Sequence, residues 1–277
     1  MLSMYVLMCP CITDPSLRAK GITTGSDIDY FNRSIERCKT FGIKIHTLPC
    51  PETIYLGKNR EPTNFLKSMN NSEFSSLLDS LEEQVRDFIS ENGRPLLIVG
   101  VDSSPSCGVD LTYYSDEKRE GRGAFLSRFN DIPAVDVKEF ADYRIYLAAP
   151  LFSEAERDFN LKLRDILEKN MFSVHLPQEL DDSIDAREDE RHRMIFEKNL
   201  EALKKADIVV GVIDGADADS GTAWEMGYAY ASGKKIISLR TDFRKVGENE
   251  LVNLMLEMSS KTVFCAEDIP GILKSPF

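Results

Sequence analysis

A group of acidic residues near position 220 contains the side chains of this sequence that are best placed to do chemistry. Asp214, Asp217 and Asp219 lie in one short glycine-containing loop, and Glu225 follows shortly after it. Like charges held close together are costly unless a ligand or a shared proton uses them. We therefore expect a small-molecule site with acid–base chemistry here, with a solvated acidic loop as the alternative.

The residues on either side predict the elements that position these carboxylates. The run from Ile208 to Ile213 is apolar and rich in β-branched residues, as in a strand that is covered on both faces. Thr222 offers a helix N-cap, which would place Glu225 in the first helical turn, at the carboxyl end of the strand. There the helix dipole would keep the carboxylate ionised. Thr222 and Glu225 also have the spacing of a capping box, so Glu225 could instead bond to the helix backbone.

Length and charge narrow the class of protein. The 277 residues exceed the size of an average domain, so we expect two domains. The net charge of −12 argues against a nucleic acid polymer as a partner, because phosphate contacts depend on Lys and Arg. No apolar run approaches the roughly 20 residues that cross a bilayer, and the first residues lack the pattern of an export signal. We expect a cytoplasmic protein that is not attached to a membrane, so its six cysteines are free thiols or metal ligands.

In the first half of the chain, three apolar segments each run into a turn that contains cysteine. Strands are expected at 5–8, 43–48 and 95–101, and the turns after them carry Cys9 and Cys11, Cys50, and Cys107. Parallel strands with helical crossovers bring their carboxyl ends to one edge of the sheet, so one thiol from each turn could meet there. Three thiolates, with Cys9 as the alternative to Cys11, would suit a metal or iron–sulfur centre with one iron open to a substrate. Inert, buried thiols are the other interpretation.

Residues 1–138 resemble the 2-thiouracil desulfurase family. The resemblance rests on Cys11 with Arg18 and Gly21 downstream, on Cys50-Pro51-Glu52, on Ser104-Pro105-Ser106-Cys107-Gly108, and on Gly121-x-Gly123 leading to Ile132-Pro133. It implies a 4Fe-4S cluster held by Cys11, Cys50 and Cys107. It also implies removal of sulfur from a thiolated base, assisted by Glu52 and Ser104.

From residue 143 onwards, strand and helix patterns alternate to the end of the chain. We expect residues 132–142 to form a short strand and a linker, and a helix to start at the capping box of Ser153 and Glu156. In the helix of Glu225, small residues recur at every fourth position and predict a ridge that packs closely against the sheet. These are Ala223, Gly227 and Ala231. The chain is thus expected to form two doubly wound α/β domains with parallel sheets, Rossmann-like or flavodoxin-like, over 1–138 and 143–277.

Residues 143–277 resemble the nucleoside 2-deoxyribosyltransferase family. The matching segments are Tyr146 to Phe152, Ala206-Asp207, Asp214-Gly215, Asp219 to Ala229, and Asn253-Leu254-Met255. The resemblance implies that a nucleoside and a free nucleobase are the substrates, with no cofactor in this domain.

The resemblance also implies roles for individual residues. Glu225 would attack the anomeric carbon and form a covalent glycosyl-enzyme, oriented by Tyr146, and a second base would then take the (2-deoxy)ribosyl group. Asp214 would exchange a proton with the leaving base. The substrate-binding residues would be Asp207, Asp219 and Gly221, together with Asn253 and Met255, which would reach into a neighbour's site. A homo-oligomer is therefore expected.

Two other functions are compatible with the same residues. A nucleoside or deoxynucleotide N-glycosidase would pass the glycosyl group to water, and the acidic loop favours an uncharged nucleoside because it would repel a phosphate. A non-catalytic sensor would bind a nucleotide derivative without cleaving it.

Overall fold

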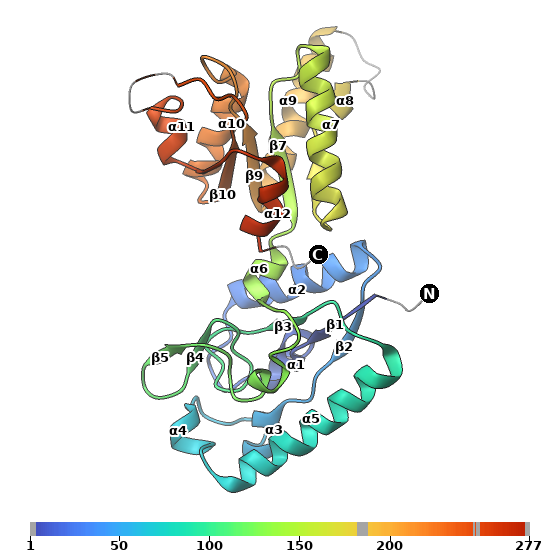
Figure 1. The fold of residues 1–277 in the computed structure, drawn as a ribbon, viewed down its shortest axis with the longest axis vertical. Coiled ribbons are helices and arrows are strands. Elements are labelled where there is room, and N and C mark those ends of the chain that lie inside the picture. The colour runs from blue at the N-terminus through green and yellow to red at the C-terminus, as the bar shows by residue number, and fades with distance from the viewer. Residues whose placement is uncertain (1–3, 182–187, 246, 248–249, 275–277) are drawn as a thin grey trace. The chain divides into compact units, whose positions relative to one another are not determined.

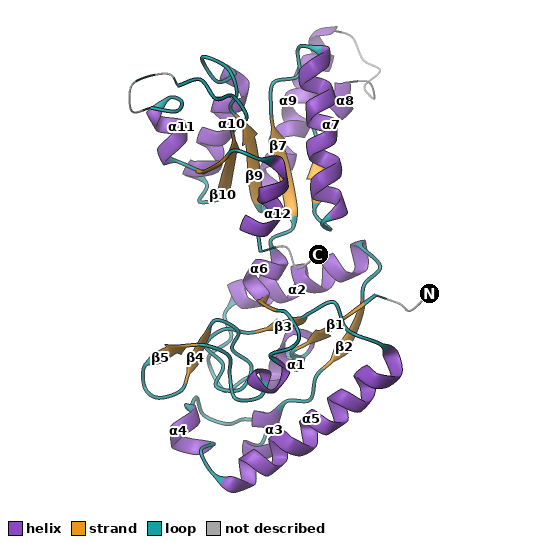
Figure 2. Cartoon of the chain, viewed as in Figure 1, coloured by secondary structure: helices purple, strands orange, loops and turns teal. Residues whose placement is uncertain are grey.

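The computed structural model describes residues 4–181, 188–245, 247 and 250–274. The chain divides into two compact units, of which unit 1 ends at Asp142 and unit 2 begins at Tyr143. Each unit is a parallel sheet with helices against it (Figure 1; Figure 2), which confirms the predicted fold class. No helix among the described residues has both the length and the apolar character of a membrane span.

The sheet of unit 1 has four parallel strands in the order β2-β1-β3-β6. The strands are β1 (Tyr5–Met8), β2 (Lys44–Thr47), β3 (Ile98–Gly100) and β6 (Ala134–Asp136). The central strands β1 and β3 are fully buried, as their apolar runs predicted. A separate antiparallel hairpin of β4 (Leu111–Tyr113) and β5 (Lys118–Glu120) was not expected from the sequence.

Two long helices cover the two faces of this sheet. Helix α2 (Gly25–Thr40) starts at a capping box of Thr24 and Asp27, and α5 (Ser72–Asn92) starts at Asn71, whose side chain accepts the Phe74 N–H. Figure 1 shows them on opposite faces. The short helices are α1 (Pro10–Thr13), η1 (Pro15–Leu17), α3 (Pro51–Leu56), α4 (Phe65–Ser68) and η2 (Leu126–Phe129).

The segment expected as a linker after β6 contains a helix. In α6 (Val137–Ala141), Val137, Phe140 and Ala141 are buried, and the helix contacts α2. The buried Arg37 guanidinium of α2 donates to the Phe140 carbonyl at 3.0 Å, and the Ser34 hydroxyl donates to the Val137 carbonyl. These buried contacts make the segment part of the core of unit 1.

Unit 2 has five parallel strands in the order β11-β10-β9-β7-β8. They are β7 (Arg144–Ala148), β8 (Ser173–His175), β9 (Ile208–Val212), β10 (Lys235–Leu239) and β11 (Lys261–Val263). Every residue of β9 is buried, as predicted. The direction of strand succession reverses between β7 and β9, where sheets of this type form ligand sites.

The helices of unit 2 are α7 (Glu154–Lys169), α8 (Gln178–Asp181), α9 (Glu188–Lys205), α10 (Ser220–Ala231), α11 (Leu254–Met258), η3 (Ala266–Asp268) and α12 (Ile269–Ile272). The predicted capping box of Ser153 and Glu156 starts α7. One core cluster joins Leu203 of α9 and Met226 of α10 to Tyr146 and Val209 of the sheet. Helices α9 and α10 therefore cover the same face.

Helix α10 begins earlier than the sequence predicted. Its N-cap is Asp219, whose carboxylate accepts the Thr222 N–H at 2.9 Å, so Thr222 lies inside the helix and Glu225 lies in its second turn. The capping-box interpretation of Glu225 was therefore wrong. The predicted ridge was wrong too, because Gly227 is exposed and a Cβ added to it would meet no atom within 4 Å, whereas Met226 faces the sheet.

Candidate functional site

Glu225 and Tyr146 meet at the switch point of the unit 2 sheet. Tyr146 is fully buried in the middle of β7, on the face that α10 covers, and Glu225 projects from α10. The Tyr146 hydroxyl donates a hydrogen bond to Oε1 of Glu225. The sequence-predicted pair is thus brought together from two elements that are 79 positions apart in the chain.

The surroundings of Glu225 raise its proton affinity. Burial raises the pKa of its carboxyl from 4.5 to about 7; the hydrogen bond from Tyr146 opposes this shift, and the charge of Asp219 adds to it. Burial, together with the Glu225 charge, raises the pKa of Tyr146, which therefore stays a hydrogen-bond donor. The expected ionisation by the helix dipole was wrong, because desolvation outweighs it at this depth.

A pocket of about 470 Å³ opens beside the carboxylate. Its other walls come from one face of α9 and from the start of α10. The lining residues are Tyr146, His192, Ile195, Phe196, Asn199, Leu200, Leu203, Gly221, Trp224 and Glu225. The volume falls in the usual range for small-ligand sites, roughly 300–1,000 Å³, and the wall is largely apolar with a few polar groups. Gly221 lies in this pocket, as expected of a substrate-binding residue.

A histidine on the neighbouring strand supports Tyr146. The ring of His175 in β8 stacks on the Tyr146 ring, with centroids 5.3 Å apart and planes inclined by 22°. Nε2 of His175 lies 3.0 Å from Oδ1 of Asn199, which lines the pocket. His175 therefore packs against the ring of Tyr146 and is itself held by the hydrogen bond with Asn199.

Two of the predicted aspartates are held by hydrogen bonds within the protein, Asp214 to the segment after β10 and Asp219 to the start of α10. Both oxygens of Asp214 accept hydrogen bonds, from the Thr241 and Asp242 N–H groups at 2.6 and 2.8 Å and from the Thr241 hydroxyl at 2.5 Å. Asp219 caps α10, close enough to Glu225 to influence its pKa. The acidic residues do not converge on one ligand.

The expected substrate contact of Asp207 is wrong. Asp207 precedes β9, at the amino end of the strand, whereas the pocket lies at the carboxyl end. Its carboxylate pairs with the Arg144 guanidinium at 2.8 Å and also accepts the Arg144 N–H at 3.0 Å. Asp207 therefore joins β7 to β9, a structural role.

Asn253 and Met255 line a separate pocket on the α11 side of α10, together with Asp217 and Gly227. The Asn253 side chain caps α11 by accepting the Met255 N–H at 3.0 Å. The Met255 side chain is 77% exposed, so within this chain neither residue reaches the Glu225 pocket.

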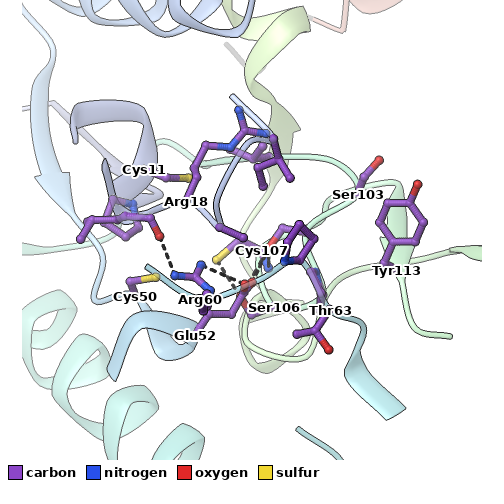
Figure 3. Close-up of a pocket in the computed structure, with 18 of the residues that line it drawn as sticks. Cys11, Arg18, Cys50, Glu52, Arg60, Thr63, Ser103, Ser106, Cys107 and Tyr113 are labelled. Carbon is purple, nitrogen blue, oxygen red and sulfur yellow. Dashed lines mark hydrogen bonds and ion pairs between the residues drawn. The ribbon is translucent and has the colours of Figure 1, made fainter. Parts of the chain in front are cut away.

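In unit 1, the carboxyl ends of β1, β2 and β3 bring cysteines to one pocket. Cys11, Cys50 and Cys107 all line it with Glu52 (Figure 3), and Ser104 is also part of the lining. Cys9 is fully buried and is not part of the pocket lining. Among the described residues, no group of three or more His, Cys, Asp or Glu side chains could hold a single metal ion.

The thiols influence one another. Burial and the proximity of Cys107 and Cys50 raise the pKa of Cys11, and burial and Cys107 raise that of Cys50. A hydrogen bond with Cys107 raises the pKa of Cys9. Such thiols become thiolates only when a cationic group compensates their charge, which is what a metal cluster provides. Three cysteines on one pocket are the kind of donor that iron–sulfur clusters use.

Glu52 is the centre of a hydrogen-bond network in this pocket. Its Oε1 accepts the Ser104 and Ser106 hydroxyls at 2.9 and 2.7 Å, and its Oε2 pairs with the Arg60 guanidinium at 3.0 Å. Ser104 also accepts the Cys107 N–H, which links the network to the cysteine turn. Both Arg60 and Glu52 are nearly buried.

Several lining residues were not predicted from the sequence. His192 and Asn199 lie two turns apart on α9, and the residues at 195, 196, 199 and 203 recur on the same helical face. That periodicity was a usable signal. Arg60 carried no signal, because only the fold brings it to Glu52.

Comparisons with known proteins concern the second half of the chain. A sequence model described as nucleoside 2-deoxyribosyltransferase matches residues 145–261. An uncharacterized protein of Ureaplasma parvum is 31% identical over 130 residues, which cover 41% of this chain and 80% of that protein. A putative 2′-deoxynucleoside 5′-phosphate N-hydrolase of Thermofilum pendens is 29% identical over 97 residues, or 35% of this chain and 66% of that protein. A 2-deoxyribosyltransferase of Bacillus psychrosaccharolyticus, whose structure is solved, is 30% identical with a TM-score of 0.40, and the match covers 46% of this chain and 89% of that enzyme.

The matched residues 145–261 include both partners of the central hydrogen bond, Tyr146 and Glu225. They also include the α9 and α10 residues that line the pocket. Residues 145–261 are therefore a domain of the nucleoside 2-deoxyribosyltransferase type, which supports a glycosyl-transferring activity for unit 2.

Proposed function

We propose that unit 2 transfers a (2-deoxy)ribosyl group between nucleobases through a covalent intermediate on Glu225. The observation that carries the proposal is the hydrogen bond from Tyr146 to Oε1 of Glu225 at the wall of a small-molecule pocket. Oε2 of Glu225 accepts no hydrogen bond from a described residue, so it is available to attack.

The reaction can be followed atom by atom. Oε2 of Glu225 forms a bond to C1′ of the nucleoside, the C1′–N bond breaks, and its electron pair leaves with the base, which takes up a proton. A second base then attacks C1′ from the side the first base left, and the carboxylate is released. For Asp214 to deliver the proton, it would have to give up its bonds to Thr241 and Asp242.

The pocket favours a nucleoside over a nucleotide. Among the described residues, neither Lys nor Arg lines the Glu225 pocket. A phosphate there would meet the Glu225 carboxylate without a Lys or Arg of the lining to compensate its charge. The apolar and aromatic side chains of Phe196 and Trp224 suit a planar base.

Base exchange provides the test. A deoxynucleoside is mixed with a free acceptor base, and the new nucleoside is followed by chromatography. Glu225→Ala should abolish exchange, whereas Glu201→Ala, which removes an exposed glutamate of α9, should leave it unchanged. Unchanged turnover in Glu225→Ala would overturn the assignment. Release of free sugar at the same rate with and without acceptor would identify a hydrolase instead.

We further propose that Asn253 and Met255 complete the pocket of a second copy in a homo-oligomer. The support is the exposure of Met255 and Met258, at 77% and 74%, on the short helix α11. Sedimentation should find an oligomer that Met255→Glu weakens, with a parallel loss of base exchange. A monomer with full activity would contradict this proposal.

For unit 1 we propose an iron–sulfur site that acts on thiolated bases. Cys11, Cys50 and Cys107 would hold a 4Fe-4S cluster, which supplies an open iron able to take up sulfur. The ion pair with Arg60 fixes the position of the Glu52 carboxylate, and the Ser104 hydroxyl is the donor that can pass a proton between Glu52 and a ligand.

Anaerobic purification tests this second proposal. We expect a coloured protein with iron and sulfide, and release of sulfide from a thiolated pyrimidine. Cys50→Ser should lose both properties, whereas Cys265→Ser, which changes an exposed cysteine of unit 2, should lose neither. A colourless anaerobic preparation without iron would reject the cluster.

A further inference from the structure

A second cavity in unit 1 is lined by arginines and belongs to neither site described above. Its lining runs from α4 through the start of α5 and includes residues of the β4–β5 hairpin, and its volume is about 640 Å³. The charged residues that line it are Arg119, Arg122 and Arg128, and no carboxylate among the described residues does so. In a chain with a net charge of −12, this local excess of positive charge favours an anionic ligand.

Arg119 is held in place without using its hydrogen-bond donors. Its guanidinium carbon lies 3.9 Å from the centroid of the Tyr114 ring, and Tyr114 stacks on Phe65 with centroids 5.3 Å apart. Phe65 in turn meets Phe74 edge-on. The Arg119 guanidinium makes no hydrogen bond or ion pair with any described residue. A guanidinium that is ordered by stacking loses little entropy when it binds an acceptor.

The other two arginines differ in how far they are neutralised. Arg122 donates to the carbonyl oxygens of Phe129 and Ile132 at 2.8 and 2.9 Å, and the charges of Asp110 and Asp131, which are not part of the cavity lining, partly compensate its own. Arg128 pairs with Asp79 and Glu82, which lie outside the cavity lining. Arg119 therefore supplies the uncompensated charge, and Arg122 adds a partly compensated one.

The rest of the wall combines apolar and hydroxyl groups. The apolar side chains are those of Phe65, Met69, Phe74 and Leu78, and the hydroxyls are those of Ser72, Ser75 and Ser127. We propose that this cavity binds a small organic phosphate, with the phosphate on Arg119 and Arg122 and an aromatic ring on the apolar wall. Guanidinium groups bind phosphate oxygens through paired N–H donors. A nucleoside 5′-monophosphate has both features and matches the size of the cavity.

The cavity shares one residue with the cysteine pocket. Pro105 lines both, and it lies in the turn that ends at Cys107. The proposed ligand needs neither the thiols nor Glu225. Its binding can therefore be measured whether or not the two proposed activities are found.

Calorimetric titration of the full-length protein with UMP tests the proposal. We compare Arg119→Gln with Lys118→Gln, because each removes one positive charge from β5. Successive strand residues point to opposite sides, and Lys118 lies against Tyr113, outside this cavity. We expect Arg119→Gln to weaken UMP binding by at least about tenfold and Lys118→Gln by less than about twofold.

Two further titrations test whether the phosphate of the ligand is what the cavity recognises. Uridine should bind at least about tenfold more weakly than UMP, because it lacks the phosphate. Ser75→Glu, which places a negative charge in the cavity, should abolish UMP binding. Absence of UMP binding, an affinity that Arg119→Gln leaves unchanged, or equal losses in both charge variants would overturn the proposal. Thermal unfolding checks that each variant is folded.

Discussion

At the scale of single residues, two opposing influences act on the pKa of Glu225. Burial holds its pKa near 7, while Tyr146 lowers the proton affinity by donating to the carboxylate. Near neutral pH the residue is therefore about half ionised, and only the ionised form can attack C1′. Activity should rise with pH through about 7.

Replacement of Tyr146 by phenylalanine should move this pH dependence. Loss of the hydrogen bond removes the influence that lowers the pKa of Glu225, so the rise in activity should shift to higher pH. At neutral pH we expect a fall in kcat of about tenfold or more, as for loss of a hydrogen bond to a charged group. The pH profile of base exchange measures both effects. A lower rate with an unshifted profile would contradict the role of Tyr146.

Replacement of Glu225 by glutamine should stabilise the protein in alkaline solution. The folded-state pKa of about 7 lies above the ordinary value of 4.5, so the protonated carboxyl contributes stability below pH 4.5 that is lost as pH rises through 7. Glutamine stays neutral, so Glu225→Gln should gain on the order of 1–3 kcal/mol at pH 8 and little at pH 4.5. Denaturant titration at both pH values measures this difference. An equal effect at the two pH values would exclude ionisation as the cause.

The sequence located Tyr146 and Glu225 but not their protonation. The two residues could be paired from the sequence because each lies in a segment whose strand or helix can be predicted from its pattern. The desolvation of Glu225 instead depends on α9, because its side chains line the pocket only once the unit is folded. The same reason explains the error at Asp207, because sequence order does not say at which end of a sheet a carboxylate near a strand acts.

At the scale of elements, Asp207 ties the amino ends of β7 and β9. Its side chain is only 4% exposed and pairs with Arg144. Asp207→Asn should therefore lower the free energy of unfolding by roughly 1–3 kcal/mol while leaving KM of the folded enzyme unchanged. Denaturant titration and initial rates at low temperature provide the two measurements. A raised KM with normal stability would restore the substrate-binding role.

The packing of α10 on β9 depends on Gly211. A Cβ at this position would lie 2.5 Å from Sδ of Met226, the residue after Glu225. Gly211→Ala should displace Met226, cost about 1–3 kcal/mol and reduce base exchange. Gly227→Ala is the matched control, because a Cβ there meets nothing within 4 Å, and it should be neutral or stabilising by up to about 1 kcal/mol. Equal effects in both variants would contradict this account of the packing.

Apolar runs in the sequence predicted the central strands well. Candidate capping residues predicted the starts of helices less reliably. The strand β9 and the capping box of α7 were both expected. The start of α10 was misplaced because two residues, Asp219 and Thr222, could each cap it, and only the backbone geometry selects Asp219. Helix α6 is short, and its burial comes from contacts with α2 that no local pattern encodes.

At the scale of the whole molecule, each site is built from residues of one unit. The cysteine pocket uses residues between 10 and 113, and the Glu225 pocket uses residues between 146 and 225. Cys50→Ser should therefore abolish sulfide release and change base exchange by less than about twofold, and Glu225→Ala should do the reverse. Both rates are measured on one anaerobic preparation of each variant. Loss of both activities in either variant would reveal coupling between the units.

The separation of 79 positions between Tyr146 and Glu225 also has a consequence for the newly made chain. Ribosomes add roughly 5–20 residues per second, so the tyrosine precedes its partner by several seconds. A nascent chain that ends before α10 has Tyr146 but no nucleophile. The proposed glycosyl transfer thus becomes possible only at a late stage of synthesis of the chain.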